Sequence, residues 1–150
     1  MNKTTYEQEL SQKGFLIYTT VGRSMRPFLR SGEDLIRIES RPEKRLKSGD
    51  VVLYRRKSGK YVLHRIVAVR RDDYVICGDN CWQLEPGIRD SQILGVLTSV
   101  IRNGKPMDVN SFGYRLMINL WWMLYPIRAL LLWSRHMAGK LWLRIKKRAS

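Results

Sequence analysis

The chain has 150 residues, which is enough for one domain with a hydrophobic core of its own. Lysine and arginine number 28 against 13 aspartates and glutamates, giving a net charge of +15. This charge indicates a partner that is negative, either anionic lipid or nucleic acid. Two cysteines, Cys77 and Cys81, are too few for a disulfide framework, and no cysteine or histidine pairs stand at zinc-binding spacing.

The positive charge is unevenly distributed. Residues 111–150 hold eight lysines and arginines and no acidic residue, so all 13 acids lie in residues 1–110. We therefore expect two parts: a mixed-charge globular domain over residues 1–110, and a basic, apolar appendage over residues 111–150.

The chain begins with a polar stretch. Residues 1–14 include four charged residues and lack the apolar run of a secretory signal peptide, so export by the general route is not expected. Thr4 or Thr5 can cap a short helix that runs through Gln12, with Gly14 as its stop.

Short apolar runs separated by turn residues occupy most of residues 15–104. Ser58-Gly59 and Asn103-Gly104 are turn signals, and residues 81–90, with Pro86-Gly87, are expected to form a loop. This spacing predicts a mostly β domain, either a sandwich or a partly closed barrel. The expected strands cover residues 15–21, 34–39, 51–54, 61–69, 74–77 and 93–101.

A serine follows the first of these strands, in the stretch Val21-Gly22-Arg23-Ser24-Met25-Arg26-Pro27. Gly22 permits a close backbone approach, and Pro27 restricts the turn. These residue types also suit an ordinary turn, so Ser24 alone does not predict catalysis.

His64 is the one histidine in the predicted β domain, and it lies in the middle of a strand. Neutral imidazole can take the proton of a serine hydroxyl near pH 7, and a carboxylate then usually orients the ring. Asp79, at the end of a strand, is a candidate for that carboxylate. A half-buried core histidine and an Asx turn remain the alternatives for these two residues.

Four motifs follow one another along the chain: Gly-x-Ser-Met-x-Pro at 22–27, Gly-Asp-Val-Val at 49–52, Val-Leu-His-Arg-Ile-Val at 62–67 and Gly-Asp-Asn at 78–80. In this order they resemble the superfamily of type I signal peptidases and LexA-type serine peptidases. The resemblance covers residues 15–100 and implies that family's β fold, with Ser24 as the nucleophile. His64 stands at the base position, as in the histidine-using, endoplasmic-reticulum-type branch, and Lys60 is not at the same site.

The acids depart from the family pattern. Asp79 matches the family's Gly-Asp-Asn aspartate, and we expect it to be structural or to orient His64. Where the histidine branch has a second acid, six residues later, this chain has Glu85. Glu85 is the second choice for orienting His64. A further departure is that family members usually carry a membrane helix before the serine motif, whereas 23 residues with a polar start precede Ser24 here.

An apolar segment lies instead near the C-terminus. Residues 116–134 hold one charge, Arg128, which would cost roughly 2.5–3.5 kcal/mol at the middle of a membrane span. Two shorter helices meeting near Pro126 are equally compatible with the sequence. Four of the five tryptophans lie in residues 111–150, as is typical of a membrane interface. We expect this segment to bind an anionic membrane surface; a helical hairpin packed on the domain or on a second subunit is the alternative.

The sequence thus favours a membrane-associated serine endopeptidase that cleaves a leader or signal-like segment after a small residue. The resemblance implies an extended polypeptide substrate, no metal and no cofactor; no specific nucleic-acid partner is expected. Two other classes are compatible with parts of the sequence: a non-catalytic, peptide-binding relative, and a self-cleaving LexA-like regulator. The regulator would need a DNA-binding domain before the β domain and a lysine base, and neither is found here. The side of the membrane and the oligomeric state stay open.

Overall fold

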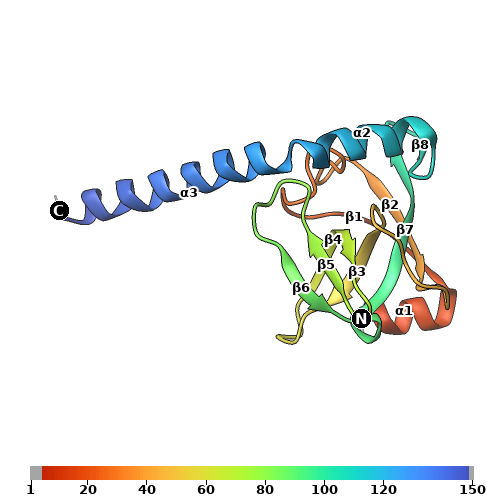
Figure 1. The fold of residues 1–150 in the computed structure, drawn as a ribbon. Helices are drawn as coiled ribbons and strands as arrows, with labels where there is room; N and C mark the ends of the chain where they lie inside the picture. Colours follow the sequence, from red (N-terminus) through yellow and green to blue (C-terminus); the bar gives the residue numbers. More distant parts are fainter. Residues whose placement is uncertain (1–4, 149–150) are drawn as a thin grey trace.

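The computed structural model describes residues 5–148, with side chains described through residue 144. It confirms a mostly β domain followed by a helical C-terminal part (Figure 1). The elements in chain order are α1 (Tyr6–Lys13), β1 (Phe15–Thr19), β2 (Leu35–Ser40), β3 (Val51–Arg55), β4 (Tyr61–Val69), β5 (Tyr74–Cys77), β6 (Glu85–Ile88), the 3-10 turn η1 (Asp90–Gln92), β7 (Ile93–Arg102), β8 (Lys105–Asp108), α2 (Phe112–Met123) and α3 (Tyr125–Arg148).

The first helix has the caps that the sequence predicts. The Thr5 hydroxyl accepts from the Gln8 main-chain N–H at 3.3 Å, and the Gln8 side chain accepts from the Thr5 N–H at 3.0 Å. This reciprocal pair is a capping box. Gly14, at a φ of 76°, ends the helix by donating its N–H to the Leu10 carbonyl at 2.8 Å.

The strands form one antiparallel sheet in the order β1-β2-β7-β3-β4-β5-β6, with β8 paired to β7. Both faces of β3 are buried, because its successive side chains enter two different hydrophobic clusters. Val51 and Leu53 pack in a cluster with α1, β1, β2 and β7, while Val52 and Tyr54 pack with β4, β5, β6 and Ile93 at the start of β7. The sheet therefore curls around two small cores rather than covering one.

Two strands lie where the sequence does not predict them. β6 falls inside the expected loop over residues 81–90, and β8 follows the Asn103-Gly104 turn. β6 contains Pro86 and is the last strand of the sheet, which is where a strand tolerates a residue without a main-chain N–H. This strand matters for the site because it begins with Glu85.

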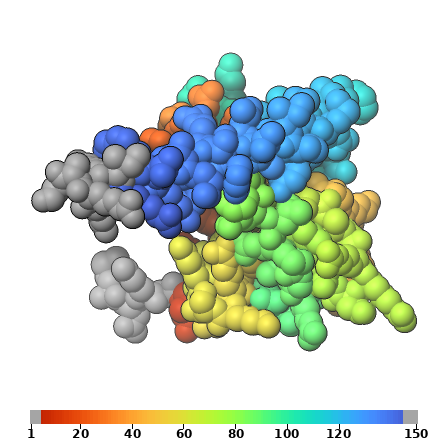
Figure 2. Space-filling view, turned by 60° about the vertical axis from the view of Figure 1, so that its left-hand side comes forward, coloured from red at the N-terminus to blue at the C-terminus, as the bar shows by residue number. Residues whose placement is uncertain are grey.

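The C-terminal segment forms two helices rather than one. Among the described residues no single helix has both the length and the apolar character to cross a bilayer; α2 together with residues 125–144 of α3 meets that criterion only as a pair bent by 60°. α2 packs on the β domain, where Tyr114 and Ile118 are buried against Phe28. α2 lies along one side of the β domain, and α3 continues from it and projects beyond the domain (Figures 1 and 2).

We expect Gly95→Ala to destabilise the fold. A Cβ atom at Gly95, in β7, would lie 2.6 Å from the Glu39 carbonyl oxygen and 2.6 Å from Ile38 Cγ2. Backbone atoms of a paired strand cannot move aside cheaply, so the free energy of unfolding should fall by about 1–3 kcal/mol. Urea denaturation measures this change.

Gly113→Ala is the matched control. A Cβ atom there, in the first turn of α2, meets no atom within 4 Å. The added helix propensity should stabilise the protein slightly, by up to about 1 kcal/mol. Equal effects of the two substitutions would contradict the close approach of β2 and β7 at Gly95.

Candidate active site

Ser24 and His64 line the same cleft, which has a volume of about 320 Å³. The cleft lies between the turn after β1 and the first half of β4. Its other lining residues are Thr20, Val21, Gly22, Met25, Leu29, Arg56, Lys60, Tyr61, Val62, Leu63 and Cys81.

The loop after β5 holds the Ser24 turn in place. Asn80 donates its main-chain N–H to the Ser24 carbonyl at 2.7 Å and its side-chain amide to the Arg23 carbonyl at 3.2 Å. At Gly78 a Cβ atom would lie only 2.7 Å from the Ser24 carbonyl oxygen and 3.0 Å from His64 Nε2. The lack of a side chain at Gly78 therefore lets the serine turn and the histidine ring approach each other.

His64 is held through its Nδ1 atom. It lies on β4 directly opposite Val52 of β3, on the face that carries Tyr54. Its Nδ1 lies 3.4 Å from Glu85 Oε1 and 3.5 Å from the Tyr54 hydroxyl oxygen. The opposite ring nitrogen, Nε2, is the one near Gly78 and the Ser24 main chain. Within residues 5–148 no hydrogen bond joins the Ser24 hydroxyl to this nitrogen.

Burial lowers the pKa of His64, although the carboxylate of Glu85 acts in the opposite direction. The ring is only 7% exposed, and Arg56 also favours its neutral form. His64 is therefore neutral near pH 7, which is the state that a general base needs.

Glu85 is the carboxylate that faces the histidine. Arg56, just after β3, donates from Nε to Glu85 Oε2 at 2.8 Å and makes a second hydrogen bond to Oε1. Burial would raise the pKa of Glu85, but the hydrogen bonds from Arg56 and Tyr54 outweigh it and hold this pKa below its usual value. Glu85 is therefore ionised beside His64.

Asp79 is placed differently. Its carboxylate is fully buried and accepts two hydrogen bonds from Arg65, at 2.8 Å from Nε and 2.7 Å from Nη2. Arg65 follows His64 directly on β4, so their side chains point to opposite faces of the strand. The structure thus assigns Asp79 to the ion pair with Arg65 and brings Glu85, the second choice from the sequence, to the histidine.

The sequence did not predict the roles of three side chains that support the site: Tyr54, Arg56 and Arg65. Strand alternation could have revealed Arg65 as the partner of a buried acid, because it interrupts an otherwise apolar strand. Arg56 and Tyr54 could not be found this way, since their roles depend on β6 being a strand. Lys60 lines the cleft with an exposed side chain.

The residues present do not suggest a metal centre. Within the described part of the chain no group of three or more histidine, cysteine, aspartate or glutamate residues is arranged to hold an ion. Both cysteines are free thiols, and burial raises the pKa of each.

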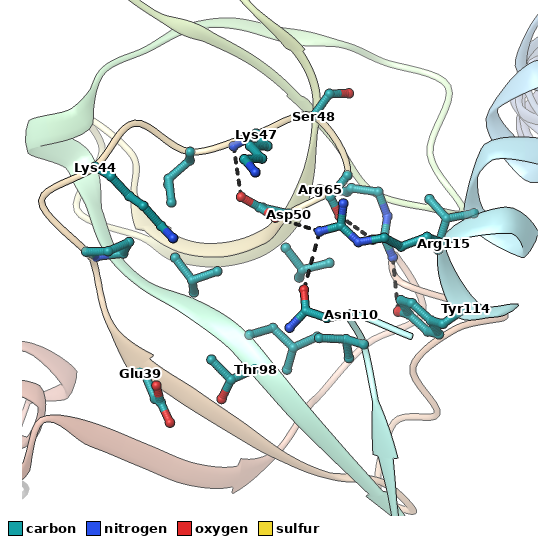
Figure 3. Close-up of a pocket in the computed structure, with 18 of the residues that line it drawn as sticks. Glu39, Lys44, Lys47, Ser48, Asp50, Arg65, Thr98, Asn110, Tyr114 and Arg115 are labelled. Carbon is teal, nitrogen blue, oxygen red and sulfur yellow. Dashed lines mark hydrogen bonds and ion pairs between the residues drawn. The ribbon is translucent and has the colours of Figure 1, made fainter. Parts of the chain in front are cut away.

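A second cavity, of about 410 Å³, lies apart from these residues, between the β2–β3 loop and α2 (Figure 3). Its polar groups largely satisfy one another. Asp50 accepts from the Lys47 main-chain N–H at 2.8 Å and lies 3.9 Å from Arg115, while Arg65 contacts the Tyr114 hydroxyl at 3.4 Å. None of Ser24, His64 and Glu85 lines this cavity.

A comparison with models of known protein families finds no match to this chain. A comparison with curated proteins finds none either. The candidate site therefore rests on its own geometry and chemistry.

We expect Glu85→Gln to lower the pKa of His64. The negative carboxylate stabilises the imidazolium ion, so its replacement by a neutral amide removes the largest of the influences that raise the pKa of this buried ring. His64 should then stay neutral to a lower pH than in the unmodified protein. NMR titration of the imidazole carbon resonances measures the change, and His136→Gln identifies the signal of the other histidine.

Glu39→Gln is the matched control for this titration. Glu39 is also a carboxylate paired with an arginine, Arg37 at 3.0 Å, but it lies on β2. A His64 pKa that rises or stays constant in Glu85→Gln would contradict the contact between Glu85 and the ring.

Proposed function

We propose that this protein is a membrane-associated serine endopeptidase of the signal-peptidase-like type, with Ser24 as nucleophile and His64 as general base. The observation that carries the proposal is the shared cleft. There, His64 turns Nε2 toward the serine turn and Nδ1 toward an ionised Glu85. A nucleophile, a neutral base and an orienting carboxylate are the three parts that acyl transfer by serine requires.

In this mechanism His64 Nε2 takes the hydroxyl proton of Ser24 as the oxygen attacks the scissile carbonyl. The new C–O bond gives a tetrahedral intermediate, and the imidazolium ion is stabilised by Glu85 on its other side. His64 then passes the proton to the leaving amine as the C–N bond breaks, which leaves an acyl-enzyme. A water molecule, deprotonated by the same ring, hydrolyses the ester and restores Ser24.

The shape of the cleft suits an extended polypeptide. β1 and β6 are the edge strands of the sheet, and the Ser24 turn follows β1. A peptide that pairs with an exposed strand edge would bring its main chain past the serine, with side chains alternating toward and away from the cleft. The resemblance in the motifs adds the expectation of a small residue before the cleaved bond.

The proposed membrane contact lies on α3. Viewed along the helix axis from residue 125 to residue 144, one side of α3 is an arc of about 120° whose exposed residues carry no charge. Arg144, Trp133 and Lys140 border this arc on one side, and Trp142 and Arg135 border it on the other. An apolar arc bordered on both sides by tryptophan and cations suits a helix lying in the plane of an anionic membrane. The arc consists of Ile127, Leu130, Leu131, Ser134, Met137, Ala138 and Leu141.

Charge favours lipid over a second copy of the chain as the partner of this arc. Residues 111–150 carry eight positive charges and no negative one. Two such segments side by side would repel each other, whereas an anionic membrane neutralises them.

A non-catalytic peptide receptor is the second candidate, favoured by one observation. The Ser24 hydroxyl makes no hydrogen bond to His64 within the described residues. Catalytic hydrogen bonds often tighten only when substrate binds, so peptidase activity remains the leading proposal.

N-terminal peptide mapping tests the peptidase. The intact protein, Ser24→Ala and His64→Ala are expressed at equal levels in the source organism, and new N-termini in membrane and secreted fractions are compared. We expect N-termini after small residues with the intact protein, and their loss with both variants, because neither can form the acyl-enzyme at a useful rate. Identical maps from three folded proteins would contradict catalysis and favour the peptide receptor.

We expect the protein to bind vesicles of phosphatidylcholine with phosphatidylglycerol, and vesicles of phosphatidylcholine alone far more weakly. Arg135→Glu with Lys140→Glu should lower the partition coefficient at least roughly tenfold, since each cation near an anionic surface contributes about 1 kcal/mol. Co-sedimentation at low and high salt measures binding.

Apolar contact is tested separately with Leu130→Gln plus Met137→Gln, which should also weaken binding. Leu143→Gln is the matched control, because Leu143 is 55% exposed but lies on the other side of α3. Equal binding to both kinds of vesicle, or a stable dimer in solution that buries α3, would contradict the lipid surface.

A further inference from the structure

The helical segment touches the candidate site itself. Trp121 of α2 donates its indole N–H to the Asp79 carbonyl at 2.9 Å, and the Arg128 guanidinium donates to the same oxygen. Tyr125 donates its hydroxyl to the Trp82 carbonyl at 2.7 Å. Three side chains from α2 and α3 thus hold two carbonyls of one loop.

That loop, residues 78–82, is the one that contacts both reacting residues. Asn80 binds the carbonyls of Arg23 and Ser24, and Gly78 lies against the Ser24 main chain and His64 Nε2. A continuous path of hydrogen bonds therefore leads from the helices through the loop to the nucleophile. Displacement of the loop by even a fraction of an ångström would change the distance between Ser24 and His64.

Arg128 is itself rigidly held. Its guanidinium carbon lies 4.4 Å from the ring centre of Trp121, 5.0 Å from that of Trp122 and 5.7 Å from that of Tyr125. Its Nε and Nη2 atoms are buried without a hydrogen-bond partner. The faces of the three aromatic rings therefore stabilise the positive charge of the guanidinium. In the sequence, Arg128 is the one charge within an apolar segment. In the structure, these contacts hold it against the protein.

The bend between the helices makes this contact geometrically suitable. α2 ends at Met123 and α3 begins at Tyr125, with 60° between them. Trp121 lies before the bend, and Tyr125 and Arg128 lie after it. Hydrogen bonds from both helices therefore hold the loop.

We propose that Trp121, Tyr125 and Arg128 are positioning residues of the active site, a clasp that holds the loop of residues 78–82 against Ser24 and His64. The proposal rests on the peptidase function proposed above and deepens it, because it makes the C-terminal helices part of the catalytic apparatus rather than a membrane attachment alone. The clasp acts through main-chain carbonyls and touches no reacting atom.

Trp121→Phe and Tyr125→Phe test the clasp, since each removes one donor and keeps the ring. Amide hydrogen exchange of Asn80, whose N–H binds the Ser24 carbonyl, should accelerate roughly tenfold in each variant, as the loss of about one hydrogen bond predicts. Exchange in the centre of β3 should stay constant. Tyr6→Phe is the control, because it also removes a tyrosine hydroxyl, and the ring of Tyr6 packs on Tyr18 and Tyr61 rather than on the loop.

Turnover separates positioning from mere stability. With an internally quenched peptide that has alanine before the scissile bond, kcat should fall roughly tenfold in both variants while KM stays constant, because substrate contacts are intact. Faster Asn80 exchange together with unchanged kcat would overturn the proposal, and so would unchanged exchange.

The two proposals fail in different ways. No turnover by the unmodified protein on this peptide, together with no new N-termini in the mapping experiment, overturns the peptidase. The exchange rates of Asn80 then decide alone whether the helices hold the loop, with unchanged rates counting against the clasp and accelerated rates supporting it.

Discussion

The buried ion pair between Arg65 and Asp79 is the interaction on which the rest of the site depends. Both residues are almost fully buried, and removal of either partner would leave an uncompensated charge, which typically costs about 3–5 kcal/mol. Arg65 also donates to the Gly49 carbonyl at 2.7 Å and lies within 3.4 Å of the Tyr114 hydroxyl. One guanidinium therefore joins β4, the turn before β3, the loop after β5 and α2, and the loop so fixed is the one that holds Ser24.

Because side chains alternate along β4, Asp79 and Glu85 have different partners. His64 and Arg65 are neighbours on β4 and must point to opposite faces, so each takes its own carboxylate. Asp79, without solvent contact, serves the permanently charged arginine. Glu85, whose side chain is one quarter exposed, serves the titrating histidine and shares its charge with Arg56. A proton can thus move at His64 without breaking a hydrogen bond of the ion pair between Arg65 and Asp79.

Much of this could be predicted from the sequence. Apolar runs and glycine turns predicted six of the eight strands, and Thr5 and Gly14 predicted the first helix, because these signals are local. The pairing of the acids could not be predicted. Pro86-Gly87 indicates a loop, and only the long-range pairing of β6 with β5 makes Glu85 a strand residue beside His64. Asp79 was expected from a family motif. Its partner is Arg65 rather than His64, because the face of β4 that carries Arg65 is the one turned toward Asp79.

The contribution of the C-terminal helices could not be predicted from the sequence either, for a different reason. Their partners are the carbonyl oxygens of Asp79 and Trp82, and every residue has a carbonyl, so no residue type marks the acceptor. Only the donors are visible, and tryptophan, tyrosine and arginine in an apolar segment also suit a membrane interface. Both uses are compatible within α2 and α3, because the donors to the loop lie between residues 121 and 128 and the uncharged arc extends to residue 141. A force on the outer part of α3 would therefore reach the loop through the same rigid helix, opposed by the hydrogen bonds to Asp79 and Trp82.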